Sequence, residues 1–401
     1  MPDPKPQSVI ELLQAMVRIN TVNGAITGRA CAEAELVGLL EQYARAWGLE
    51  TTRLPLAGYA DQLLITCNAT GENDSGGTSG GGSEGWLLFD SHLDTVAVEG
   101  MTIDPFGAKI QGDKLFGRGA CDTKGTGAAM LWALKQYASQ NDRPHNIALL
   151  FSVDEEIAMQ GVQAFVTNDL PKLGWLPSAV IVGEPTEHTP VIAHNGCVRW
   201  ELITHGKAVH SSTPGEGRSA IADMVRALAA IQSQYIDKLD IQDDLTGLAA
   251  CSVNLIQGGS APNIIPDRCV AEIDRRLVPG EDPSTVLPAV AAVIDQAVAG
   301  DAGFAYEQKL LIEHPPLSSE SGDAALPIVR SAMHACGVRR PAVGAPFATH
   351  AGYFSQAGLP TVVFGPGSPY PAHTKDEWVS IKEIEQGTRV YQAMMCQNLR
   401  D

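Results

Sequence analysis

The sequence has little positive charge, few aromatic residues and no long apolar run. Its 401 residues include 28 lysines and arginines against 46 aspartates and glutamates, and the formal net charge is -18. A field of this sign argues against binding to nucleic acid or to an anionic membrane surface through general electrostatic attraction. The longest apolar runs are much shorter than the roughly 20 residues of a membrane-spanning helix. We therefore expect neither a nucleic-acid partner nor a membrane partner.

Paired cysteines are also missing. The eight cysteines are scattered along the chain, and no two of them form a C-x-x-C pair. This spacing supports neither a zinc ribbon nor a disulfide framework, and it is typical of small buried thiols in a reducing compartment. The first residues, MPDPKPQSVIELLQAM, lack the basic region and apolar core of a secretory signal. We therefore expect a cytoplasmic protein.

The chain is long enough for two hydrophobic cores, since single cores stop growing near roughly 250–300 residues. Short apolar runs alternate with helical patterns, which predicts an α/β fold with a mostly parallel sheet covered by helices on both faces. The four apolar runs are at 85–92, 145–153, 178–184 and 358–365, and the clearest helical patterns are at 125–138 and 380–399. The glycine- and serine-rich segment 71–85 is expected to be a loop that joins two strands.

Residues 194–312 have a different pattern. Their strands have one exposed face, and the order strand–helix–strand–strand–helix–strand predicts an inserted α+β, ferredoxin-like domain. The expected strands are at 198–207, 252–259, 268–277 and 305–314, and the expected helices at 220–235 and 283–298. We thus expect a discontinuous catalytic domain, 1–193 and 313–401, and a lid or dimerisation domain at 194–312.

Potential metal ligands lie at or just beyond the carboxyl end of each apolar run, and one more lies in a glycine-rich turn between the first two runs. In chain order, the acids and imidazoles at these places are His92, Asp94, Asp122, Glu155, Glu156, Glu184 and His373. Open α/β sheets bind their ligands at the carboxyl ends of the strands. We therefore expect these side chains to meet at one edge of the sheet.

Glu155 and Glu156 are adjacent, although two carboxylates at the end of a buried strand repel each other and resist the loss of water. Taken singly, such residues are usually ordinary, because paired glutamates mostly face solvent and a lone histidine is mostly a hydrogen-bonded structural group. Together they suggest a metal site. Imidazole and carboxylate ligands without cysteine suit zinc, cobalt or manganese, and one carboxylate can bridge two ions about 3.5–4 Å apart.

The same segments carry a family resemblance. In order, SHLDTV, GRGACDTKG, DEE, GEPT, GPG and AHTKDEW resemble motifs of the metallohydrolase family of acetylornithine deacetylase, succinyl-diaminopimelate desuccinylase, aminoacylase and bacterial glutamate carboxypeptidase. The resemblance covers nearly the whole chain, including the insertion. It implies two divalent ions, zinc first and cobalt or manganese as alternatives.

The resemblance also implies a role for each ligand. Asp122 would bridge the two ions, His92 and Glu184 would complete one site, and Glu156 and His373 would complete the other. Asp94 would orient the imidazole of His92, and Glu155 would be the general base that takes a proton from the attacking water. This division of labour would explain why two adjacent glutamates are kept.

Further expectations concern the insertion. By resemblance, His210 would help to stabilise the oxyanion, while Asn263 and Arg276 would bind the substrate, with Arg276 clamping its α-carboxylate. Homodimerisation through the lid domain is also implied. One position departs from the family pattern: His350 stands where several relatives carry an acid. The interpretations left open are an altered hydrogen bond near the pocket, a residue that helps to read the substrate, and a harmless helix-start variant.

These expectations combine into one predicted function, a metal-dependent hydrolase of linear amides that deacylates a small N-acyl amino acid. The nearest alternative is a carboxypeptidase or dipeptidase that uses the same site. A non-catalytic metal-binding assembly module is a more remote alternative, as are a regulatory dimer with incidental activity and a nucleophilic role for Cys121. The segments GPG and AHTKDEW favour the acetylornithine deacetylase branch.

Overall fold

The computed structural model describes residues 5–70 and 85–397, so the expected loop at 71–85 lies, apart from Gly85, outside the described residues. The chain divides into two compact units. The first comprises Met1–Ile192, Ser318–Gly344 and Thr349–Asp401, and the second comprises Ala193–Leu317 with Ala345–Ala348. The second unit is an insertion in the first, with bounds a few residues wider than the expected 194–312.

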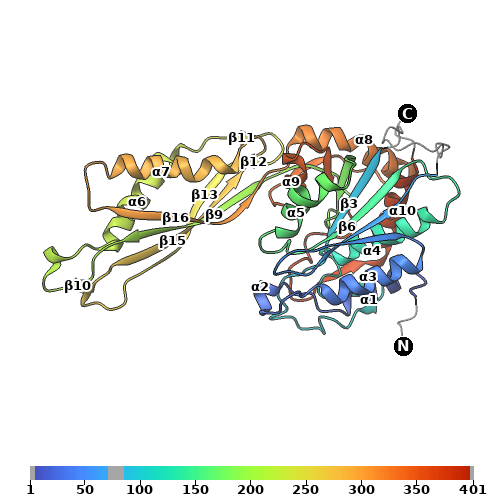
Figure 1. The fold of residues 1–401 in the computed structure, drawn as a ribbon, viewed down its shortest axis with the longest axis horizontal. Helices are drawn as coiled ribbons and strands as arrows, with labels where there is room; N and C mark the ends of the chain where they lie inside the picture. Colours follow the sequence, from blue (N-terminus) through green and yellow to red (C-terminus); the bar gives the residue numbers. More distant parts are fainter. Residues whose placement is uncertain (1–4, 71–84, 398–401) are drawn as a thin grey trace. The chain divides into compact units, whose positions relative to one another are not determined.

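The first unit is built on an eight-stranded mixed sheet (Figure 1). Its strands in spatial order are β1 (Glu50–Leu54), β2 (Gln62–Cys67), β6 (Asn146–Ser152), β3 (Trp86–His92), β7 (Pro177–Val182), β18 (Thr361–Val363), β8 (Val191–His194) and β17 (Val343–Ala345). The four expected apolar runs form the central strands β6, β3, β7 and β18, and they are parallel. Antiparallel strands extend this parallel centre on both sides.

The register of the central strands brings their carboxyl ends into line. His92 at the end of β3 lies opposite Ser152 at the end of β6, and Asp90 lies opposite Val182 at the end of β7. Each strand is buried over almost its whole length, as expected for a sheet covered on both faces. The segments that carry the candidate ligands therefore leave the sheet at the same edge.

The same unit contains the helices that cover this sheet and the short helix α2. In chain order they are α1 (Val9–Val17), α2 (Gly24–Thr27), α3 (Ala34–Ala46), α4 (Lys124–Ala138), α5 (Gln160–Ala164), α8 (Ser319–Ala335), α9 (Ala351–Gln356) and α10 (Ile381–Cys396). Ser8 and Ser380 cap α1 and α10 at their N-termini, where each side chain accepts a hydrogen bond from the backbone N–H of a glutamate three residues later. A small sheet of β4 (Lys109–Gln111), β5 (Lys114–Phe116) and β19 (Trp378–Ser380) was not expected.

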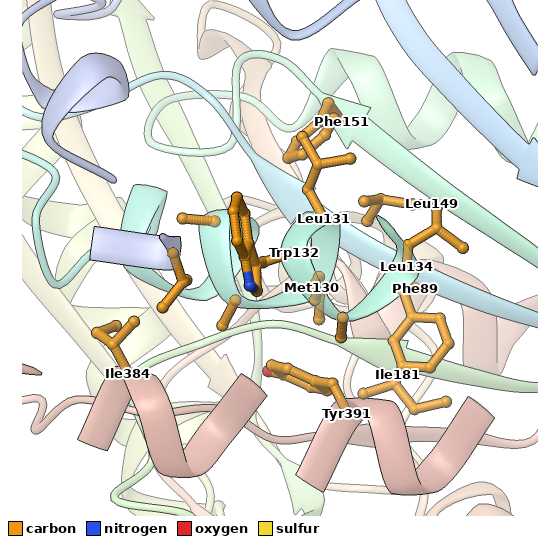
Figure 2. Close-up of a cluster of buried hydrophobic side chains, with 14 of the residues drawn as sticks. Phe89, Met130, Leu131, Trp132, Leu134, Leu149, Phe151, Ile181, Ile384 and Tyr391 are labelled. Atoms are coloured by element: carbon orange, nitrogen blue, oxygen red, sulfur yellow. The ribbon is translucent and has the colours of Figure 1, made fainter. Parts of the chain in front are cut away.

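Helix α4 is the central helix of this core. Figure 2 shows Ile384 and Tyr391 of α10 reaching towards it from one side, while Phe151 of β6 lies on another. The tight fit depends on glycine, because a Cβ atom on Gly127 would come within 2.9 Å of the Phe151 and Ser91 side chains. This packing fixes the start of α4 at Lys124, two residues after Asp122.

The inserted unit has a four-stranded antiparallel sheet in the order β13 (Ala250–Gly258), β15 (Arg268–Leu277), β9 (Gly196–His205), β16 (Ala305–His314). Helices α6 (Ala220–Gln234) and α7 (Val286–Ala297) cover one face and bury Trp200 and Ile273. The short pairs β10 (Val209–His210) with β14 (Ile264–Ile265), and β11 (Gln242–Asp243) with β12 (Gly247–Leu248), complete the unit. The predicted order of strands and helices is confirmed.

Across residues 5–70 and 85–397, none of the helices has the length and apolar character that crossing a membrane requires.

Candidate metal centre

Five of the expected ligands form two clusters that share Asp122. The ligand atoms of His92, Asp122 and Glu184 all lie within 4.8 Å of one another, and those of Asp122, Glu156 and His373 do the same. Asp122 Oδ1 lies 3.1 Å from His92 Nε2, and its Oδ2 lies 3.1 Å from His373 Nε2. The two oxygens of one carboxylate therefore face two different imidazoles, which is the arrangement that a bridging ligand needs.

The charge balance of the clusters fits divalent cations. Burial, followed by the neighbouring acids, raises the pKa of Glu184 well above its usual value, and burial also raises the pKa of Glu156. Hydrogen bonds from His373 and His92 hold the pKa of Asp122 well below its usual range despite its burial. So many carboxylates with only two imidazoles leave an excess of negative charge, which two divalent cations would neutralise. The donors, nitrogen and oxygen without sulfur, suit zinc, cobalt or manganese.

The loop that presents Asp122 is held by Glu377, a residue that the sequence analysis did not single out. The fully buried carboxylate of Glu377 accepts hydrogen bonds from the backbone N–H groups of Gly119 (3.0 Å), Cys121 (2.8 Å) and Asp122 (3.0 Å). It also pairs with Arg118 Nη1 at 2.7 Å. Four donors that converge on one buried carboxylate fix the position of Asp122, the candidate bridging ligand.

Arg118 links this loop to the segment after His373. Its Nη2 donates to the carbonyl oxygen of Thr374 at 3.2 Å, and its Nε donates to that of Ala97 at 3.0 Å. The pair Arg118–Glu377 thus connects the segments that carry two of the candidate ligands. Its signal in the sequence was the charged residues that flank the ligands, in GRG and in KDEW.

Asp94 organises the segment of the two glutamates. Its main-chain oxygen is the nearest acceptor for His92 Nδ1, at 3.0 Å, whereas its carboxylate Oδ1 lies 3.5 Å from that nitrogen. The carboxylate accepts the backbone N–H groups of Glu155 (2.9 Å) and Glu156 (3.1 Å), and Asn23 Nδ2 at 2.8 Å. Burial raises the pKa of Asp94, but its hydrogen bonds outweigh burial and lower the pKa overall.

Asn23 was missed by the sequence analysis, and it joins Asp94 to the turn before Glu155. Its Nδ2 also donates to Asp154 Oδ1 at 3.0 Å. Asp154 has a φ of 63°, a left-handed conformation that is uncommon for a residue other than glycine. This turn and the two N–H contacts of Asp94 set the directions in which Glu155 and Glu156 leave the backbone.

The two glutamates differ in their surroundings. The side chain of Glu156 lies 3.2 Å from His373 Nε2, inside the second cluster. Within the described parts of the chain, no group donates a hydrogen bond to the carboxylate of Glu155. Burial raises the pKa of Glu155 well above its usual value, and the negative charges of Glu156 and Asp122 add to this effect. Such a carboxylate is suited to accepting a proton.

His350 lies beneath this centre. It occupies the N-cap position of α9 and is 1% exposed, and its Nδ1 lies 2.8 Å from Asp90 Oδ2. Ser152 donates to the other Asp90 oxygen at 2.8 Å. The imidazole ring approaches that of His92 edge-on, with 6.4 Å between the ring centroids. The histidine that departs from the family pattern at this position therefore places an imidazole against a buried carboxylate.

His210 and Asn263 lie together in the inserted unit. The N–H of Ser211 donates to the main-chain oxygen of Asn263 at 3.0 Å, and both expected residues are exposed. The N–H of Ser212 donates to His210 Nδ1 at 3.2 Å, which leaves the hydrogen of the neutral ring on Nε2. A donor at Nε2 is the form that an oxyanion would require.

Arg276 and Arg275 point to opposite faces of the inserted sheet, as expected for neighbours on a strand. Arg275 is 1% exposed and pairs with Glu281 on the helix-covered side. Arg276 lies on the open face, where its Nε is 2.7 Å from Asp274 Oδ1. Asp274 also pairs with Arg199 of β9 at 2.8 Å, a residue for which no role was expected from the sequence.

Residues 88–397, about three quarters of the chain, match peptidase family M20/M25/M40. The chain belongs to this family. The acetylornithine deacetylase of Myxococcus xanthus is 30% identical over 311 residues, which cover 77% of this chain and 78% of that protein.

Solved structures of other M20 proteins share the fold. An M20 family metallo-carboxypeptidase from Sulfolobus solfataricus has a TM-score of 0.78 at 19% identity, covering 97% of this chain and 99% of that one. A dinuclear metal-binding M20 peptidase from Bacillus subtilis has a TM-score of 0.68 at 15% identity, covering 97% and 96%.

Family membership confirms the predicted class of activity: this M20 protein is a metallohydrolase that acts on amide or peptide bonds. The expected fold, an α/β catalytic domain with a lid, is confirmed as well.

Proposed function

We propose that this M20 protein is a di-zinc amidohydrolase that removes the acyl group from a small N-acyl amino acid with a free carboxylate. The observation that carries the proposal is the position of Asp122, whose two oxygens each lie 3.1 Å from a different imidazole. Two ligand clusters that share one carboxylate favour a paired metal site over a single one.

In this proposal His92, Asp122 and Glu184 hold one ion, and Asp122, Glu156 and His373 hold the other. When bound, the ions supply Lewis acidity that polarises the scissile carbonyl and acidifies water. Glu377 and Arg118 keep the bridging carboxylate in place, so that it does not turn towards one imidazole alone.

Glu155 is the proposed general base. Its carboxylate takes a proton from the attacking water and passes it to the leaving amine nitrogen, so that the amide C–N bond breaks to give an acid and a free amine. Its raised pKa and lack of a hydrogen-bond donor among the described residues support this role. Asp94 fixes the base by holding its backbone N–H.

The inserted unit is proposed to supply the groups that recognise the substrate. Arg276 presents part of its guanidinium on the open sheet face, where it can bind a carboxylate. His210 offers an Nε2–H donor for the oxyanion, and Asn263 lies beside it. The same groups suit a carboxypeptidase or dipeptidase, which is the alternative. The 30% identity to an acetylornithine deacetylase favours the deacylase.

The test is hydrolysis of a panel of N-acyl amino acids and dipeptides by the full chain. The protein is stripped with a chelator and then given zinc, cobalt or manganese, and the Glu155→Gln variant is assayed beside it. We expect turnover that returns with metal and that the variant loses, with N-acyl amino acids preferred to dipeptides. Turnover that resists complete metal removal would refute the proposal, and a preference for dipeptides would select the alternative.

We also propose that the protein forms a homodimer through the inserted unit. Strand β13 is an edge strand of that sheet, and Leu255 and Ile256 on it are more than half exposed. Val225 on α6 is 59% exposed, which adds apolar surface to the same unit. Sedimentation at micromolar concentration should show a dimer that Leu255→Asp weakens. A wild-type protein that sediments only as a monomer would remove this proposal.

A further inference from the structure

The open face of the inserted sheet carries a carboxylate shared between two guanidiniums. Arg199 on β9 lies opposite Asp274 on β15, and its Nε and Nη2 lie 3.1 and 2.8 Å from Asp274 Oδ2. Arg276, two residues further along β15, places its Nε 2.7 Å from Oδ1. The Asp274 side chain is only 9% exposed, whereas those of Arg199 and Arg276 are 38% and 42% exposed. Both guanidiniums therefore keep N–H groups that face solvent.

The charge of this cluster depends on Arg199. Two guanidiniums and one carboxylate leave one net positive charge. Without Arg199, Asp274 and Arg276 would form a neutral pair, and an incoming carboxylate would meet the repulsion of Asp274 beside the attraction of Arg276. Asp274 is ionised, because the hydrogen bond from Arg199 and the charge of Arg276 lower its pKa in spite of its burial.

Among the described residues, the other cations of this face do not take the place of Arg199, and Arg268, opposite His205, stands six residues before Asp274 on β15. The ammonium group of Lys309 on β16 lies 3.4 Å from the carboxylate of Glu201, and the two charges offset each other. Glu272, opposite Glu201 in the sheet register, contributes negative charge that acts on Arg199. Lys309 is thus paired with Glu201, and Glu272 adds negative charge, so the positive charge beside Asp274 comes from the two arginines that flank it.

We propose that Arg199 is a positioning residue that frees Arg276 to bind the carboxylate of the substrate, by taking up the charge of Asp274. The site then selects anions with a carboxylate over their uncharged analogues. This inference rests on the proposed function, because Arg276 is the group proposed there to hold the substrate carboxylate. If Arg199 had only a structural role, the effect of replacing it would not depend on the charge of the ligand.

The experiment uses the metal-loaded full chain with N-acetyl-L-methionine and N-acetyl-L-ornithine, each beside its C-terminal amide. Acetate release gives kcat and KM, and titration calorimetry in a Glu155→Gln background gives the binding constant without turnover. The proteins are the wild type, Arg199→Gln, Arg199→Lys and the double variant Arg199→Gln/Asp274→Asn. Lys309→Gln is the matched control, because it removes one positive charge from the same sheet face. Melting curves of all variants confirm that they are folded.

We expect Arg199→Gln to raise KM and the dissociation constant for the carboxylate compounds about tenfold, with kcat little changed. The amides should be unaffected, and Lys309→Gln should behave like the wild type. The double variant should recover most of the loss, because removing the charge of Asp274 leaves Arg276 as an unopposed cation. Arg199→Lys, which keeps the charge, should stay close to the wild type.

Three results would overturn the inference: equal losses for carboxylates and amides, no recovery in the double variant, or no binding of either carboxylate by the wild type. If Arg199→Gln does not fold, the double variant and Arg199→Lys decide the question by the same comparison of carboxylates with amides. Failure of the proposed function is distinguishable, because it would appear as selective carboxylate binding without any acetate release.

Discussion

Replacing Glu377 by glutamine should separate the bridging ligand from its support. The carboxylate of Glu377 accepts four hydrogen bonds, three from backbone N–H groups in the loop 119–122 and one from Arg118. The side chain of glutamine has one carbonyl oxygen and one NH2 group. The NH2 group would face backbone N–H groups from which it cannot accept a hydrogen bond. The substitution also removes the partner of the buried Arg118, which is 3% exposed.

The expected cost follows from these contacts. Removing one partner of a buried ion pair typically destabilises a protein by about 3–5 kcal/mol, because the remaining charge is left without compensation. Arg118 keeps its bonds to the carbonyl oxygens of Ala97 and Thr374, so we expect the lower half of that range, about 3–4 kcal/mol. For a unit of this size the melting temperature should fall by roughly 5–10 °C. The affinity for the second metal ion should also fall, because Asp122 loses its backbone support.

Tryptophan fluorescence is a suitable assay, because five of the six tryptophans, all except Trp200, belong to the catalytic unit. Titration of the stripped protein with zinc gives the affinity and the number of ions bound. Glu385→Gln is the matched control, since Glu385 is an exposed glutamate on α10, eight residues after Glu377, and its replacement should change stability by less than about 0.5 kcal/mol. A Glu377→Gln protein with unchanged melting temperature and zinc affinity would refute this account of the loop.

Three further substitutions test the site and the fold. Glu155→Gln should lower kcat about 100- to 10 000-fold while two zinc ions still bind, whereas Glu156→Gln should lose one ion; the reverse pattern would exchange their roles. His350→Asp should destabilise the protein by about 3 kcal/mol at pH 7.5, because it sets a second buried carboxylate against Asp90, whereas His350→Asn should cost less. Burial lowers the pKa of His188 to about 4, so its neutral form is favoured in the folded state. The contribution of His188 to the free energy of unfolding is then fully present above about pH 6.5 and is lost as the pH falls towards 4, with a loss of about 2 kcal/mol at pH 5. His188→Asn should reduce the change with pH in the free energy of unfolding, measured with urea over this range. An unchanged pH dependence would contradict the role given to His188.

Much of the fold could be predicted from local patterns. The central strands β3, β6 and β7 are continuous apolar runs, and α10 carries both a capping serine and a helical period, so each is specified by residues close in sequence. The small sheet of β4, β5 and β19 was missed because its strands have only three residues each. Strands β4 and β5 form a local hairpin, whereas the pairing of β19 with β5 joins segments more than 260 residues apart. Pairings of that range leave no periodic signal in the sequence.

The sequence by itself determined which residue types stand at the strand ends, and therefore that His92, Asp122, Glu156, Glu184 and His373 could share a site. Only the tertiary structure decided how they are held. Asn23, Arg118 and Glu377 lie far from their partners in sequence, and a buried hydrogen bond has no local pattern that reveals it. The same holds for Arg199, which looks like any half-exposed strand arginine until the register of β9 and β15 brings it opposite Asp274. Chemistry was encoded in residue type and spacing, whereas support and charge balance depend on contacts that only folding creates.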